Sequence, residues 1–179
     1  MDHAAVATTM GCYRVSLKRK QQAIRSVGPL VTDAAGNPAP FTSATACQRA
    51  SVAVPFGSCT EPSNVKAGGA ACPIRFQCAG CGSCRPDPSC LPALEQHIAS
   101  LRADRETAQA MNAADYVLAS LSAEIGAFTA VAEKMRSSLS QLDPAQRAEV
   151  EEASRILRRA RAARTLPLAS ITSRATETA

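Results

Sequence analysis

Apolar residues recur at alternating intervals of three and four along the C-terminal half of the chain. One stripe consists of Met111, Ala114, Leu118, Leu121, Ile125, Phe128, Ala132, Met135, Leu139 and Leu142. An upstream stripe consists of Leu91, Leu94, Ile98, Leu101 and Ala108, with a phase slip near Arg105. This spacing predicts long helices with one apolar face. The two stripes fit a helical hairpin bent between Arg105 and Asp115, or a straight helix that forms a coiled coil with another chain.

A further helix is predicted to begin after Asp143. Asp143 can cap it, Pro144 suits the first helical position, and Gln146 can reach back in a capping box. Its apolar side is formed by Ala153, Ile156, Leu157 and Ala160, and its end carries Arg155, Arg158, Arg159, Arg161 and Arg164. Cations at a helix C-terminus complement the helix dipole. They also suit phosphate binding, and the sequence does not choose between these roles.

The segment from Arg14 to Gly28 is predicted to be a basic helix. Ala23, Ile24 and Val27 recur at helical spacing, and Gly28 with Pro29 forms a stop signal. The segment has no acidic residue, and its basic residues are Arg14, Lys18, Arg19, Lys20 and Arg25. Such a helix can follow the phosphates of DNA, or it can simply be a solvated face. These five residues are the candidate nucleic-acid-binding set.

These patterns divide the chain into five segments and predict a mainly α fold. An N-terminal helix lies in residues 1–28, and a linker with a possible short strand at 50–57 occupies residues 29–57. A small cysteine-rich module follows in residues 58–90. The long helices occupy residues 91–164, and residues 165–179 are expected to form a flexible tail.

Composition narrows the class of protein. The 179 residues carry a net charge of +5, which suits an acidic partner such as DNA. Aromatic residues are scarce, with four Phe, two Tyr and no Trp, so a large compact core is not expected. The sequence has no signal-peptide pattern and no apolar run long enough for a membrane span. We therefore expect a cytoplasmic protein without a membrane partner, in which the eight cysteines do not form disulfides.

The cysteine-rich module has the spacing of a metal site. Its cysteines are Cys59, Cys72, Cys78, Cys81, Cys84 and Cys90. Cys78 and Cys81 are separated by two residues, one of them Gly80, so both thiolates can reach one metal ion. Four thiolates close a tetrahedral structural zinc site, and Cys59 with Cys72 is the natural second pair. Cys84 can replace one of them, and Cys90 and His97 are further candidates.

Three alternatives to zinc remain open for this module. A Cys-x-x-Cys pair can be a redox site, although the surrounding thioredoxin-like pattern is lacking. Cys78, Cys81 and Cys84 repeat at the spacing of part of a ferredoxin cluster motif. The cysteines can also be free thiols.

The first thirteen residues contain a candidate catalytic motif: His3, Thr8, Thr9 and Tyr13. This motif resembles the last catalytic motif of the tyrosine recombinases, or site-specific integrases, whose tyrosine attacks a DNA phosphate. The sequence departs from the family motif at two positions. Cys12 stands at the nucleophile position, so Tyr13 comes one residue late, and Asp2 replaces a glycine. His3 and Tyr13 are therefore vestigial candidates for the catalytic pair.

The resemblance extends along most of the chain. The basic segment and the spacing of Cys59, Cys72, Cys78 and Cys81 are similar to the C-terminal region of actinobacterial and transposon-encoded integrases. Cys12, Cys47, Cys84 and Cys90 stand where that pattern has tyrosine. Because the catalytic arginines and lysine lie upstream of the motif in that family, the resemblance implies a C-terminal part of a mobile-element integrase. Such a part is expected to bind DNA, a partner protein or both, without catalysing strand exchange on its own. Its candidate partners are DNA, a full-length integrase and a second copy of the chain through the coiled coil.

Two other functions are compatible with the same residues. One is a stand-alone zinc and coiled-coil protein that binds DNA or a partner without any recombinase role. The other is an inert gene remnant, which predicts weak helicity and no bound metal.

Overall fold

The structure, a computed structural model, describes residues 15–74 and 77–162. The helices are α2 (Leu17–Val27), α3 (Ala44–Ala50), α4 (Pro62–Lys66), α5 (Leu91–Ala110), α6 (Asp115–Ser140) and α7 (Pro144–Ala162). Short 3-10 helices, η1 (Gly28–Leu30) and η2 (Pro88–Cys90), follow α2 and precede α5. The strands β1 (Val52–Val54), β2 (Gly57–Cys59) and β3 (Cys84–Arg85) form one small sheet. The prediction of a mainly α fold is confirmed.

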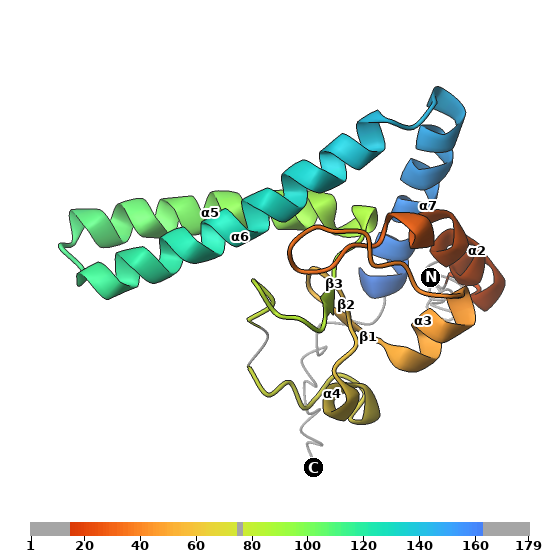
Figure 1. Ribbon diagram of the computed structural model, residues 1–179, viewed down its shortest axis with the longest axis horizontal. Coiled ribbons are helices and arrows are strands. Elements are labelled where there is room, and N and C mark those ends of the chain that lie inside the picture. Colours follow the sequence, from red (N-terminus) through yellow and green to blue (C-terminus); the bar gives the residue numbers. More distant parts are fainter. Residues whose placement is uncertain (1–14, 75–76, 163–179) are drawn as a thin grey trace, which may run out of the picture.

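Helices α5 and α6 form a hairpin that extends away from the rest of the molecule (Figure 1). The chain reverses between Met111 and Ala114, where Asn112 adopts a positive φ of 52° that asparagine tolerates well. The turn falls inside the predicted bend, so the two apolar stripes fold onto each other. At the base of the hairpin, Leu94, Ile98 and Leu101 share one buried cluster with Phe128, Ala132 and Met135. A coiled coil with a second chain stays a prediction.

A second apolar cluster fixes α2 against α7. It contains Ala23 and Val27 of α2 and Val150, Ala153 and Leu157 of α7. Leu139 and Leu142, at the end of the long stripe, pack against it. The apolar sides predicted for both helices are therefore the sides that they bury.

The sheet is antiparallel, in the order β1-β2-β3. Gly57 begins β2 with a φ of +143°, and a Cβ added there would lie 2.3 Å from the carbonyl oxygen of Arg85. Position 57 therefore requires glycine, because β2 begins there directly against the backbone of Arg85 and Pro86. Strand β1 lies within the strand suggested for 50–57, whereas α3 was not foreseen in the segment expected to be a linker.

The predicted capping box of α7 is present. The backbone N–H of Gln146 donates to Asp143 Oδ1 at 2.8 Å, and the backbone N–H of Asp143 donates to Gln146 Oε1 at 3.2 Å. We expect Asp143→Ala to lower the free energy of unfolding by about 1 kcal/mol, because the first turn loses a hydrogen-bond acceptor. Urea denaturation measures this effect. The control Asp104→Ala, at an exposed position inside α5, should be neutral or slightly stabilising; equal losses in both variants would contradict the capping role.

Candidate metal site and basic face

Strand pairing brings together cysteines that are distant in the sequence. Cys59 of β2 lies directly opposite Cys84 of β3. Cys59, Cys78 and Cys84 are buried in the same apolar cluster as the base of the hairpin, and half-buried Cys81 packs against it. The side chains of Cys78 and Cys84 share a hydrogen bond. This hydrogen bond and burial raise the pKa of the Cys84 thiol above its ordinary value, and the neighbouring Cys78, Cys81 and Cys59 add to the shift.

The chain between Cys78 and Cys84 makes two consecutive tight turns. The backbone N–H of Cys81 donates to the carbonyl oxygen of Cys78 at 3.2 Å, and that of Cys84 donates to the carbonyl oxygen of Cys81 at 3.0 Å. Gly80 has a φ of +68°, a backbone conformation that glycine adopts without strain. The tight turn predicted between Cys78 and Cys81 is therefore present.

Cys72 differs from the other three cysteines of the predicted zinc set. It is half-buried in the loop after α4 and is not among the partly buried apolar side chains that pack against the cysteine cluster. No disulfide joins two of the described cysteines. Within residues 15–74 and 77–162, no group of three or more His, Cys, Asp and Glu side chains has the arrangement of a metal site. The zinc site remains a prediction.

The two further candidate ligands have other partners. His97 stacks on Phe56, with ring centroids 4.8 Å apart, and its Nε2 lies 3.7 Å from Glu124 Oε1. Cys90 is 2 % exposed, and its Sγ accepts a hydrogen bond at 2.9 Å from Arg161 of α7. Burial raises the pKa of Cys90 to about 12.

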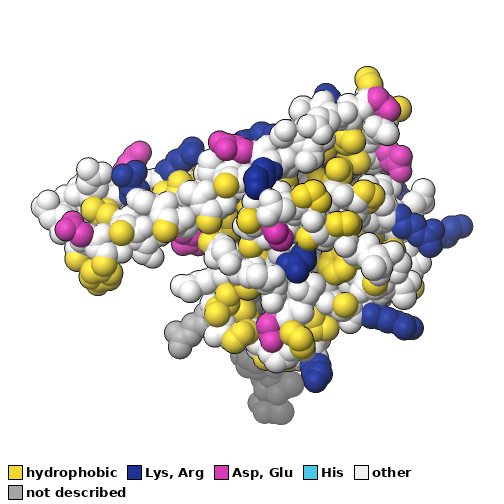
Figure 2. Space-filling view, in the orientation of Figure 1, with side chains coloured by type: hydrophobic (Ala, Val, Ile, Leu, Met, Phe, Trp, Pro, Cys, Tyr) yellow, Lys and Arg dark blue, Asp and Glu magenta, His cyan; other side chains and the backbone are white. Residues whose placement is uncertain are grey.

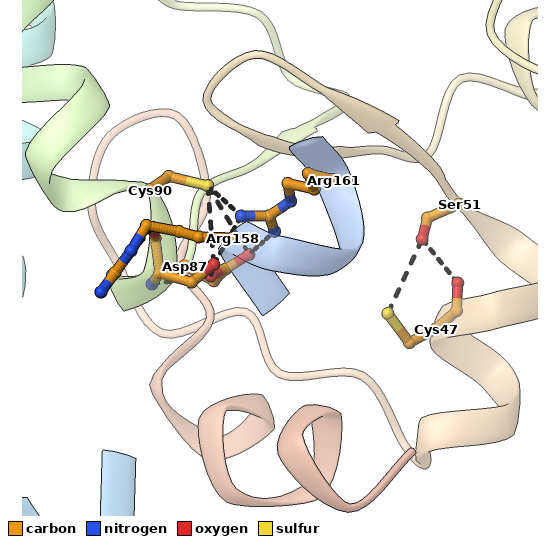
Figure 3. Close-up of polar contacts among 7 residues, drawn as sticks. Cys47, Ser51, Asp87, Cys90, Arg158 and Arg161 are labelled. Carbon is orange, nitrogen blue, oxygen red and sulfur yellow. Dashed lines mark hydrogen bonds and ion pairs between the residues drawn. The ribbon is translucent and has the colours of Figure 1, made fainter. Parts of the chain in front are cut away.

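Arg161 belongs to a buried polar cluster that joins the end of α7 to η2 (Figure 3). Its guanidinium donates to Asp87 Oδ2 at 2.7 Å and to Ser89 Oγ at 2.5 Å. Asp87 also accepts the backbone N–H of Ser89 at 2.9 Å. Although burial alone would lower the pKa of Arg161, the Asp87 carboxylate and the hydrogen bonds to Asp87 and Cys90 raise that pKa above its ordinary value. No local sequence pattern indicated this cluster, because its arginine and its carboxylate lie 74 residues apart.

A cavity of about 650 Å³ lies between α2, the segment 40–48 and α7. Its apolar wall includes Leu17, Phe41 and Leu157, and Cys47 and Arg161 also line it. Cys47 lies on α3, where its sulfur is 3.7 Å from Ser51 Oγ (Figure 3). The sequence could not indicate this cavity, because it arises only when α2 packs against α7.

The predicted nucleic-acid-binding residues Lys18, Arg19, Lys20 and Arg25 all lie on α2, and basic side chains project from that side of the molecule (Figure 2). Helix α7 runs beside α2 in the opposite direction: Arg19 Nη2 lies 3.8 Å from Glu152 Oε1, and Ser26 Oγ donates to Glu149 Oε1 at 2.7 Å. The basic N-terminal end of α2 therefore lies beside the arginine-rich C-terminal half of α7. We call this surface the α2–α7 basic face.

The remaining candidates, His3, Cys12, Tyr13 and Arg14, lie outside the described residues, as does the expected flexible tail 165–179. Among the helices that the structure describes, none combines the length and apolarity of a membrane span. No protein family, curated protein or solved structure matches the chain.

Proposed function

We propose that this chain binds DNA through the α2–α7 basic face as the non-catalytic C-terminal part of a site-specific integrase. The supporting observation is that two basic segments more than a hundred residues apart in the sequence lie side by side. The first is α2, which contains no acidic residue, and the second is the end of α7. Adjacent cationic helices suit the closely spaced phosphates of a duplex.

The basic side chains of this face differ in whether they already pair with a carboxylate. Arg19 and Arg155 both approach Glu152, at 3.8 Å and 2.5 Å, and Arg161 is committed to Asp87. Lys18, Arg25 and Arg159 are exposed and make no ion pair with any residue in the described ranges. These three side chains are the best placed to contact phosphates. Arg19 can also contribute by leaving its long, exposed ion pair, which is worth little in water.

Zinc completes the proposal as a structural ion bound by thiolates of the cysteine-rich module. Bound zinc would supply no chemistry for strand exchange; its role would be to stabilise the sheet and the turns around it. In the predicted set, Cys59 and Cys78 are buried in one apolar cluster and half-buried Cys81 packs against it, whereas Cys72 is half-buried in the loop after α4. The resemblance to integrases supports the same role through the spacing of Cys59, Cys72, Cys78 and Cys81.

Replacing Lys18, Arg19 and Arg25 together with Gln should weaken binding to a DNA duplex and reduce its salt dependence. Each phosphate contact contributes about 0.9 to the slope of log K against log salt, so the slope should fall by roughly two to three units. Fluorescence anisotropy of a labelled duplex at several salt concentrations measures both quantities.

The matched control removes three exposed positive charges elsewhere, with Lys66, Arg102 and Arg105 replaced by Gln. This control should keep most of the slope. An equal loss in both triple variants would indicate only a general effect of net charge and would contradict the α2–α7 basic face. DNA should be shifted without nicking, and a covalent DNA adduct that disappears in Tyr13→Phe would contradict the non-catalytic role.

A further inference from the structure

We propose that the cavity between α2, the segment 40–48 and α7 binds a small carboxylate with an apolar body, such as a medium-chain fatty acid. This binding site goes beyond the DNA-binding role and needs no metal in the cysteine-rich module. The cavity measures about 650 Å³, within the range of about 300–1,000 Å³ that is typical of small-molecule pockets in proteins. A single small organic molecule can therefore occupy it.

One face of α2 forms the first wall of the cavity. Four residues spaced three or four apart share this face and line the cavity: Leu17, Lys20, Ile24 and Val27. Lys20 is half-buried among these apolar neighbours, whereas Lys18, on the same helix, is exposed. A lysine in this position packs its stem against apolar side chains and presents its ammonium group at their edge. The apolar wall therefore carries a cation within it.

The other walls are also mainly apolar. Phe41 from the segment 40–48 and Leu157 and Ala160 of α7 line the cavity. On the α2 side, Leu17 is 64 % exposed, although the other cavity-lining residues of its helix face are buried or half-buried. Contact between apolar side chains and water is unfavourable, and the apolar body of a ligand would cover this surface.

The charges that line the cavity favour a negatively charged ligand. Among the residues that the structure describes, the charged groups of the lining are Lys20, Arg25, Arg161 and the carboxylate of Asp87. Asp87 is paired with Arg161 at 2.7 Å (Figure 3), so the lining as a whole has an excess of positive charge. Burial raises the pKa of the Cys47 thiol, so this group stays neutral at pH 7. A carboxylate would meet these cations away from bulk water, where their attraction is stronger.

Isothermal titration calorimetry of the full chain with decanoate, kept below its micelle concentration, tests the proposal. Wild type should bind one decanoate per chain, and decanol, which has the same apolar body without the charge, should bind about tenfold more weakly. Lys20→Gln should weaken decanoate binding about tenfold, because the carboxylate loses a charge-assisted hydrogen bond. Lys18→Gln is the matched control on α2, since Lys18 does not line the cavity, and should bind decanoate as wild type does.

A variant that fills the cavity provides a second test. Ala160→Phe places an aromatic ring where Ala160 lines the cavity and should abolish decanoate binding. Ala148→Phe adds the same ring at an exposed position of α7 and should leave binding unchanged. Equal helical signals in circular dichroism would show that both variants are folded.

A third measurement uses the unmodified protein and does not depend on any variant folding. Cys47 lines the cavity, whereas Cys72 does not. Saturating decanoate should therefore slow the alkylation of Cys47 by iodoacetamide and leave the rate at Cys72 unchanged. Mass spectrometry of the digested protein measures both rates.

The proposal is overturned if wild type does not bind decanoate, if decanol binds equally well, or if Ala160→Phe binds decanoate as wild type does. Protection of Cys47 by a peptide with the sequence of residues 163–179, without protection by decanoate, would also overturn it, because the cavity would then accept a segment of this chain. The DNA titration is a separate measurement, so failure of the carboxylate site can be distinguished from failure of the DNA-binding role.

Discussion

Asp87→Ala is expected to lower the free energy of unfolding by about 3 kcal/mol. The carboxylate is 5 % exposed and accepts hydrogen bonds from Arg161 and from the backbone of Ser89. Removing it leaves the Arg161 guanidinium largely buried without its counter-charge, a change that typically costs about 3–5 kcal/mol. The lower end of this range applies because the Arg161 side chain keeps 26 % exposure and can move toward water.

The exposed ion pair between α5 and α6 provides the control for Asp87→Ala. Arg136 Nη2 lies 2.7 Å from Glu95 Oε1, but the two side chains are 52 % and 41 % exposed. Glu95→Ala should therefore cost less than about 1 kcal/mol. Urea denaturation followed by circular dichroism compares the two variants. Similar small losses in both would mean that the contact between α7 and η2 is not a stabilising one.

Met135→Ala is the second change with a large expected effect, about 2–4 kcal/mol of lost stability. Met135 is 1 % exposed and lies in the cluster that joins the base of the hairpin to the sheet and the cysteines. Truncation removes apolar contacts and leaves a cavity that the packed surroundings fill only in part. The loss should appear as a lower midpoint of thermal unfolding.

Met111 offers a matched control for Met135 because the chemical change is the same. It lies at the tip of the hairpin and is 76 % exposed. Met111→Ala should change the free energy of unfolding by less than about 0.5 kcal/mol. If both variants lost the same stability, the cluster at the base of the hairpin would not be the main core.

Periodicity and capping residues alone predicted most of the helical structure. The apolar stripes indicated α5 and α6, and Asp143 with Gln146 marked the start of α7. These signals are local, since helix formation depends on side chains three or four residues apart and on groups at the helix ends. The sequence also indicated the basic character of α2, which follows from composition alone.

Contacts between distant segments required the tertiary structure. The reversal at Asn112 resolved the choice between a hairpin and a straight helix for this chain, because both satisfy the same periodicity. The pairing of Arg161 with Asp87 depends on how α7 meets η2, and the α2–α7 basic face depends on two helices at opposite ends of the chain.

The cysteines show most clearly that sequence alone does not predict contacts between distant segments. Spacing in the sequence reveals which thiols are close along the chain, so the turn between Cys78 and Cys81 was foreseeable. It does not reveal strand register, and a shift of one residue would point Cys84 to the other face of the sheet. The sequence therefore determined the helices, their caps and the positions of the cysteines and basic residues along the chain. Only the folded chain decided which of those groups meet, because their partners lie dozens of residues away and are brought together by burial of apolar surface.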